Sequence, residues 1–240
     1  MPISSARSVG DLATEIPSAI SIFERLGIDY CCSGETTLYE ACRASGANPE
    51  EVARELDEAE RSSGDHSDFR DWSASTLGEL VNHILETHHV FTKNELDRLD
   101  HLVRRVCAAH GAKHQELLSI QGLFSDLKQE LLAHLQKEEM MLFPYLYEIE
   151  RSAASGARTN PPVFGTVRNP IRVMAMEHDN ACEMLRNIRE LSSEYTPPSD
   201  ADESYAELYR GLNGLATDLH MHIHLENNIL FPNAVEMENL

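Results

Sequence analysis

Two histidine–glutamate pairs with identical spacing are the residues in this sequence most suited to chemistry. Glu138 follows His134 by four positions, and Glu226 follows His222 by four. Residues four apart lie on one face of an α-helix, one turn above the other. Each pair can therefore offer one imidazole nitrogen and one carboxylate to a single metal centre.

Two further histidines, His89 and His178, interrupt apolar stripes on other predicted helices. The stripes step by three and four residues and run Val81, Leu85, His89, Thr92, Leu96 and Ile171, Met174, His178, Cys182, Leu185. One such histidine alone is usually a hydrogen-bonded core residue. Here four predicted helices each carry a histidine on the apolar face, and two of them also carry a carboxylate there. This combination indicates a shared cation, because buried unpaired charges are very costly.

The types of these six residues indicate which metal they suit. Imidazole and carboxylate without thiolate argue against a structural zinc site. Six ligands, two of which can bridge, fit two ions, and carboxylate-bridged di-iron sites occur in helix bundles. We therefore expect two iron ions, while manganese and zinc stay open. Cys182 is interpreted as a small core residue, and His220 and His224 are expected on a solvated face.

A second candidate site is the cysteine pair Cys31 and Cys32. The pair lies in a loop just before a helix that Thr37 and Glu40 begin with capping-box spacing. A nearby helix N-terminus lowers the pKa of a thiol, which would make the pair reactive. The alternative is that both are small, half-buried residues.

These residues must be positioned by helices, since no convincing strand alternation is present. Helices are expected over residues 11–26, from Leu38, from Pro49, and over 76–109, 114–148, 170–195 and 202–230. The prediction is an all-α protein with an antiparallel four-helix bundle preceded by a small helical N-terminal domain. The expected boundaries are residues 1–60, a polar linker over 61–75, and the bundle over 76–240.

Composition narrows the partners and the compartment. The formal net charge of −20 argues against nucleic acid and anionic membranes, which need a basic surface. No apolar run is long enough to span a bilayer, and the N-terminus has no signal-peptide pattern. Five irregularly spaced cysteines do not form a secreted disulfide framework. We expect a cytoplasmic protein.

The chain resembles the iron–sulfur cluster repair di-iron proteins, which join a short cysteine-bearing N-terminal domain to a hemerythrin-like domain. The segments that carry the resemblance are Asp29–Gly34, His134–Pro144, Glu177–Asp179 and His222–Pro232. The resemblance implies terminal ligands at His89, His134, His178 and His222, bridging carboxylates at Glu138 and Glu226, and the cysteine pair at Cys31 and Cys32. The chain departs from the family in a longer loop between Tyr147 and Pro170, and in Ser33 where glycine is commoner.

The resemblance implies repair of iron–sulfur clusters damaged by nitrosative or oxidative stress, by supplying iron, removing nitric oxide, or both. Damaged iron–sulfur proteins are the expected clients, nitric oxide or O₂ the small ligands, and a homodimer is left open. One alternative is a hemerythrin-like protein that reversibly binds a diatomic gas. It is disfavoured because an oxygen carrier has a further histidine where Cys182 stands. Another alternative is a di-iron nitric oxide reductase with the same six ligands.

Overall fold

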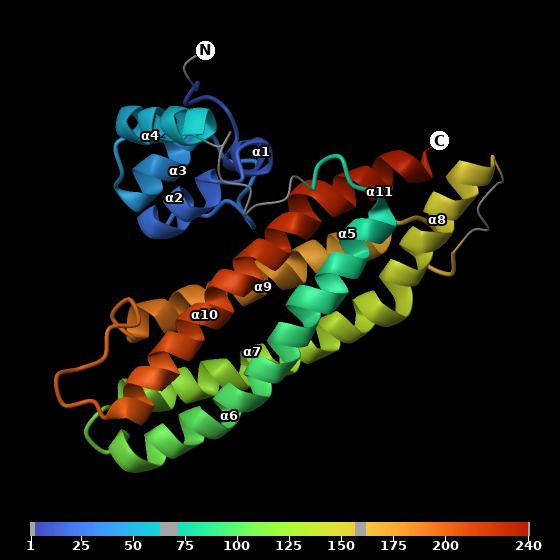
Figure 1. The fold of residues 1–240 in the computed structure, drawn as a ribbon. Helices are drawn as coiled ribbons and strands as arrows, with labels where there is room; N and C mark the ends of the chain where they lie inside the picture. Colours follow the sequence, from blue (N-terminus) through green and yellow to red (C-terminus); the bar gives the residue numbers. More distant parts are fainter. Residues whose placement is uncertain (1–2, 63–71, 157–161, 240) are drawn as a thin grey trace. The chain divides into compact units, whose positions relative to one another are not determined.

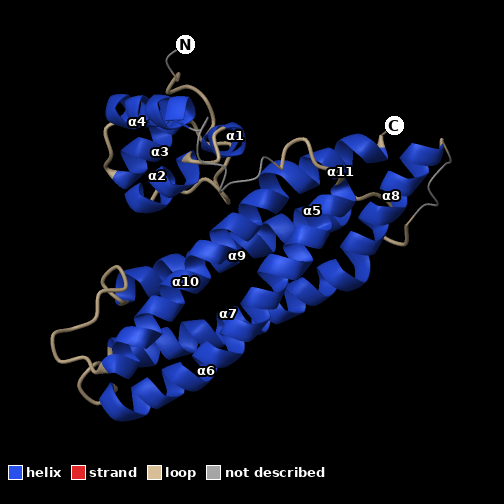
Figure 2. Cartoon of the chain, in the orientation of Figure 1, coloured by secondary structure: helices blue, strands red, loops and turns tan. Residues whose placement is uncertain are grey.

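The computed structural model describes residues 3–62, 72–156 and 162–239, and within them the regular secondary structure is helical (Figure 2). The described residues also contain a single isolated bridge between Ser8 and Thr37. The all-α prediction is confirmed for these residues. Their contacts divide the chain into two compact units. The bundle unit comprises residues 81–219, and the terminal unit joins residues 1–80 to residues 220–240. Most of the expected linker, residues 63–71, lies outside the described residues, so the domain boundaries stay a prediction.

The bundle unit is built from α6 (Val90–His110), α7 (Glu116–Lys137), α9 (Arg168–Leu191) and the first part of α10 (Glu203–Leu225) (Figure 1). Each of the four contributes its apolar stripe to one core, which includes Leu99, Val103, Phe124, Leu127, Leu185, Ile188, Leu208 and Leu212. A turn over residues 111–115 reverses the chain between α6 and α7, and residues 192–202 connect α9 to α10. The stripes read from the sequence are therefore the faces that pack together.

The connection after α7 is more helical than expected. After the short segment η2 (Glu138–Leu142), α8 (Phe143–Ser155) extends the chain well beyond the predicted end at residue 148. It ends at Gly156, whose φ of 67° is in the left-handed region that terminates helices. The predicted long loop is correspondingly shorter, and its residues 157–161 lie outside the described part.

The N-terminal helices of the terminal unit are α1 (Val9–Glu15), α2 (Ala19–Leu26), α3 (Leu38–Ser45) and α4 (Pro49–Ser62). The single helix predicted over residues 11–26 is wrong, because the chain breaks between α1 and α2 at Pro17. Proline disfavours helical backbone at the residue before it, and Ile16 has φ −124° and ψ 81°. The capping box of Thr37 and Glu40 is confirmed, with both hydrogen bonds present.

The other helical segments adjoin α6 and α10 in the sequence, next to predicted metal ligands. α5 (Leu77–His83) and η1 (Ile84–His89) precede α6, and η3 (Glu226–Leu230) and α11 (Phe231–Glu238) follow α10. A capping box formed by Thr76 and Glu79 is present at the start of α5. Among the helices of the described residues, none combines the length and the apolar character that crossing a membrane requires.

Candidate metal centre

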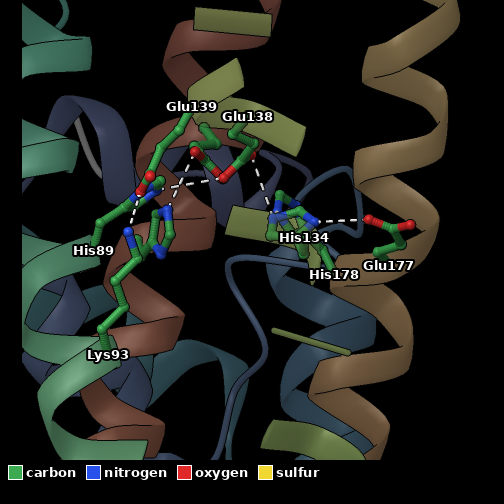
Figure 3. Close-up of polar contacts among 9 residues, drawn as sticks. His89, Lys93, His134, Glu138, Glu139, Glu177 and His178 are labelled. Atoms are coloured by element: carbon green, nitrogen blue, oxygen red, sulfur yellow. Dashed lines mark hydrogen bonds and ion pairs between the residues drawn. The ribbon is translucent and has the colours of Figure 1, made fainter. Parts of the chain in front are cut away.

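Three buried histidines converge on one buried carboxylate in the bundle unit. His89 ends η1, His134 is on α7, His178 is on α9, and Glu138 begins η2. All four are at most 3% exposed, and Glu138 is completely buried. The Nε2 atoms of His89 and His134 lie 3.4 and 3.3 Å from the carboxylate oxygens of Glu138. The Nε2 atoms of His134 and His178 are 3.1 Å apart, so these side chains face one another (Figure 3).

The outer nitrogens of two of these histidines are held by carboxylates. Nδ1 of His89 lies 2.8 Å from Glu139, and Nδ1 of His134 lies 2.9 Å from Glu177 (Figure 3). Each carboxylate also accepts a hydrogen bond from a lysine, Lys93 for Glu139 and Lys137 for Glu177. Although partial burial raises the pKa of both carboxyls, the lysine and histidine hydrogen bonds bring it below the ordinary value. Both are therefore ionised acceptors.

This arrangement fixes which imidazole nitrogen is available. A neutral histidine whose Nδ1–H donates to a carboxylate presents a lone pair at Nε2. In His89 and His134 these lone pairs are directed at the oxygens of Glu138, which are also electron-rich. Lone pairs at about 3.3 Å are compatible when a cation, or a proton, lies among them. The inner nitrogens and the Glu138 oxygens, together with the carboxylates that hold the outer nitrogens, are thus arranged as in a metal site with nitrogen and oxygen ligands.

Three short π-helical turns occur at the candidate ligands. η1 ends at His89, η2 begins at Glu138, and η3 begins at Glu226. In η2 the N–H of Phe143 donates to the carbonyl of Glu138, five residues earlier, and in η3 the N–H of Phe231 donates to that of Glu226. Single π-turns within α-helices are often found at functional sites. Sequence periodicity did not predict these turns, although the spacing from glutamate to phenylalanine and proline is the same at η2 and η3.

The prolines after these turns explain part of their geometry. Pro144 and Pro232 stand in the first turn of the α-helices that follow, α8 and α11. A proline has no N–H, and its ring clashes with the carbonyl four residues earlier in a regular helix. The carbonyls four residues before these prolines are those of Met140 and Asn228, which lie inside η2 and η3, and a wider turn there relieves the conflict.

The terminal unit contains the other two predicted ligands, His222 and Glu226. They are 1% and 0% exposed, and Nε2 of His222 lies 3.2 Å from a carboxylate oxygen of Glu226. This is the same pairing, at the same sequence spacing, as that of His134 and Glu138. The two histidine–glutamate pairs are therefore equivalent in local structure as well as in sequence.

The cysteine loop, residues 30–34, corrects one prediction. Cys31 is a free thiol and is buried, and burial followed by the charges of Asp29 and Glu24 raises the pKa of that thiol well above its ordinary value. The predicted lowering of this pKa is wrong for Cys31, because burial and negative neighbours outweigh the helix N-terminus. The sulfur atoms of Cys31 and Cys32 are 3.7 Å apart. Asp29 organises the loop by accepting hydrogen bonds from the backbone of Cys31, Cys32 and Ser33.

The expectation that His220 and His224 lie on a solvated face is wrong for His224. This residue is 2% exposed, and burial lowers its pKa to about 4. His220 is partly buried and pairs with Glu24 at 2.9 Å. The helical face opposite His222 is covered within the terminal unit by N-terminal residues, which a helical wheel of one segment does not reveal.

Comparison with known proteins bears on both parts of the chain. A family model described as "Hemerythrin HHE cation binding domain" matches residues 80–234, and one described as "Domain of Unknown function (DUF542)" matches residues 5–60. The chain is 34% identical to a probable iron–sulfur cluster repair protein of Haemophilus influenzae, over 95% of this chain and 96% of that one. It belongs to the hemerythrin-like iron–sulfur cluster repair family.

Other members of the repair family are similar over the same extent. The chain is 33% identical to the iron–sulfur cluster repair protein YtfE of an Enterobacter species, over 96% of this chain and 97% of that protein. It is also 33% identical to the protein of that name from Pectobacterium atrosepticum, over 97% and 98%. The predicted family and fold class are confirmed. The family model that matches residues 80–234 is described as cation-binding, in agreement with the buried histidine and glutamate groups of this chain.

Proposed function

We propose that this protein holds two iron ions and uses them in the repair of damaged iron–sulfur clusters. The proposed ligands are His89, His134, His178 and His222 as terminal nitrogens, and Glu138 and Glu226 as bridging carboxylates. One observation carries the proposal: in His89 and His134 the outer nitrogen is held by an ionised carboxylate while the inner nitrogen faces a buried glutamate. This is the way in which metal-binding histidines are usually oriented.

The equivalence of the two histidine–glutamate pairs supports a centre that uses both. Each glutamate is fully buried, contacts the histidine one turn earlier, and begins a π-turn. The family model for a cation-binding domain spans residues 80–234 and so includes all six proposed ligands. We therefore infer that His222 and Glu226 supply the same kind of ligands as His134 and Glu138.

The chemistry follows from the charge of these ligands. Bound iron would supply redox activity and positions for small ligands such as nitric oxide or O₂, because two carboxylates balance only half the charge of two ferrous ions. The protein orients His89 through Glu139 and His134 through Glu177. Carboxylate ligands protonate as the pH falls, so the iron they hold can be released. This property suits a donor to damaged clusters, and the repair function named for the relatives supports that assignment.

Metal analysis of matched variants tests the ligands. We expect about two iron ions per chain in the purified protein and loss of iron in Glu138→Leu/Glu226→Leu. Glu130→Leu is the control, because Glu130 is an exposed glutamate on α7, the helix that carries His134. Retention of iron by the double variant, or zinc in place of iron, would exclude the proposed centre.

A repair assay then tests the use of the iron. A purified client whose cluster has been damaged with nitric oxide is incubated with the loaded protein, and recovery of its cluster absorption is followed. We expect iron to leave this protein in proportion to the recovery. Nitrous oxide formed over many turnovers without iron loss would instead favour a nitric oxide reductase, and a stable, reversible gas adduct would favour a gas-binding protein.

The cysteine pair is assigned a part in the transfer, also as a proposal. The sulfur atoms of Cys31 and Cys32 are 3.7 Å apart, and Cys32 is disulfide-bonded in this structure. Once that disulfide is reduced, the two sulfurs can act together as a thiol pair or as two ligands to departing iron. We expect Cys31→Ser/Cys32→Ser to keep its iron and to slow cluster recovery at least about tenfold. Cys107→Ser, which changes another buried free cysteine, is the control. Full-rate repair by the double variant would rule out the assignment.

A further inference from the structure

Two adjacent asparagines of η3 hold the cysteine loop by its main chain. The side-chain amide of Asn227 donates to the carbonyl of Cys31 at 3.1 Å, and that of Asn228 donates to the carbonyl of Tyr30 at 3.0 Å. All of these residues belong to the terminal unit. The two hydrogen bonds therefore join the backbone next to a candidate thiol to the turn that starts at Glu226.

The side chain of Asn228 fits closely against the N-terminal helices. A Cβ atom added at Gly34 would lie 2.5 Å from Oδ1 of Asn228, and one added at Gly10 would lie 2.8 Å from it. Neither glycine has a positive φ. Glycine is thus needed at both positions for space and not for backbone freedom. The asparagine is enclosed, which leaves its amide few alternative positions.

A second set of contacts holds the ring of Tyr30. Its hydroxyl donates to Glu24 at 2.9 Å, and the same oxygen of Glu24 lies 2.9 Å from Nδ1 of His220. The ring packs edge-on against His224, with centroids 5.5 Å apart. The loop is therefore anchored to the ligand-bearing helix both through its main chain and through the side chain of its first residue.

We propose that Asn227 and Asn228 are positioning residues that couple the occupancy of the metal centre to the closure of the cysteine loop. The proposal rests on the proposed function in one respect, the role of Glu226 as a ligand. A metal ion that fixes Glu226 also fixes the first residues of η3, and the two amides transmit that order to residues 30 and 31. Because Cys31 is buried, its sulfur can be attacked only when the loop opens.

The reactivity of Cys31 therefore measures loop opening. The full-length protein is alkylated with iodoacetamide after reduction, and the modification rates of Cys31 and Cys42 are determined by peptide mass spectrometry. Cys42 is also buried and free, and it serves as an internal reference in the terminal unit. In the metal-free state, Cys31 of Asn227→Ala and of Asn228→Ala should each be alkylated roughly 5- to 100-fold faster than Cys31 of the unaltered protein. This is the effect expected when a buried carbonyl loses its hydrogen-bond donor.

Iron loading provides the second arm. Iron should slow alkylation of Cys31 several-fold in the unaltered protein, and this protection should be lost or much reduced in both variants. Asn239→Ala, which removes a hydrogen bond to Val235 at the end of α11, should behave like the unaltered protein. The ratio of metal-free to iron-loaded rates is the readout that a purely structural role would leave unchanged.

The outcomes separate this inference from the proposed function. Unchanged Cys31 rates in both variants overturn it, and so does equal acceleration of Cys42, which would show general destabilisation. Bound iron that leaves the Cys31 rate of the unaltered protein unchanged also overturns the coupling. Failure to bind iron at all refutes the proposed function and with it the coupling, whereas the metal-free arm still decides whether the asparagines hold the loop.

Discussion

Replacing the carboxylates that orient the histidines should weaken metal binding without removing any ligand. The change is Glu139→Gln and, separately, Glu139→Ala. Glutamine can still accept a hydrogen bond from Nδ1 of His89 but has no charge, whereas alanine leaves the ring without its acceptor. The corresponding changes at Glu177 test His134 in the same way.

The expected magnitude follows from the local geometry. Loss of a group that orients a metal-binding histidine typically costs 10- to 100-fold in metal affinity, or about 1.4 to 2.8 kcal/mol. The side chain of Glu139 is 29% exposed, so solvent screens part of its charge. We therefore expect about tenfold weaker iron binding for Glu139→Gln and up to about 100-fold for Glu139→Ala.

The lysine that holds this carboxylate offers a matched comparison. The Lys93 side chain is 43% exposed, and ion pairs of that kind contribute up to about 1 kcal/mol. Lys93→Met should therefore weaken iron binding by less than about fivefold. Competition with a ferrous chelator of known affinity, read by its absorbance, gives all the constants on one scale. An affinity of Glu139→Ala equal to that of the unaltered protein would refute the reasoning about the oriented tautomer.

Three further predictions concern stability and packing. Metal-free Glu138→Leu should be as stable as the unaltered protein in urea unfolding, or up to about 3 kcal/mol more stable, because a buried carboxylate is replaced by an apolar group. The melting temperature of this variant should no longer rise with iron. A large loss of metal-free stability would contradict the prediction. Gly34→Ala should destabilise the protein by about 1 to 3 kcal/mol, since its Cβ would lie 2.5 Å from Asn228, and an unchanged urea midpoint would refute the close fit. The pKa of Asp202 is lowered from 3.8 to about 2, first by the backbone N–H of Tyr205. The contribution of Asp202 to stability is therefore complete above pH 3.8 and declines as the pH falls to 2. The difference in urea midpoint between the unaltered protein and Asp202→Ala should shrink over that range, and a constant difference would contradict this prediction.

The positions of the candidate ligands could be predicted because they follow from helical periodicity alone. His134 and Glu138 fall on an apolar stripe, and the structure shows both buried and in contact. The π-turns could not be predicted in the same way, because a pattern with a period of 3.6 residues assumes that no residue is inserted. The repeated spacing between each glutamate and the following phenylalanine and proline was the available signal.

Tertiary contacts explain the remaining differences. The burial of His224 depends on Tyr30, almost two hundred residues earlier in the chain, and no local pattern reports such a contact. Likewise, the pKa of Cys31 depends on burial and on Asp29 more than on the adjacent helix. The break at Pro17 was readable, since proline limits the backbone of the residue before it.

The two five-residue π-turns, η2 and η3, have a consequence for sequence change in this protein. Each contains one residue more than an α-helical turn would, and that surplus rotates everything after it by about 100° around the helix axis. Deleting a single residue between Glu138 and Phe143 would turn the apolar face of α8, which includes Leu146 and Ile149, away from its packing partners. Length in these five-residue segments should therefore be under stricter selection than the identity of their exposed members, such as Met140 and Met141.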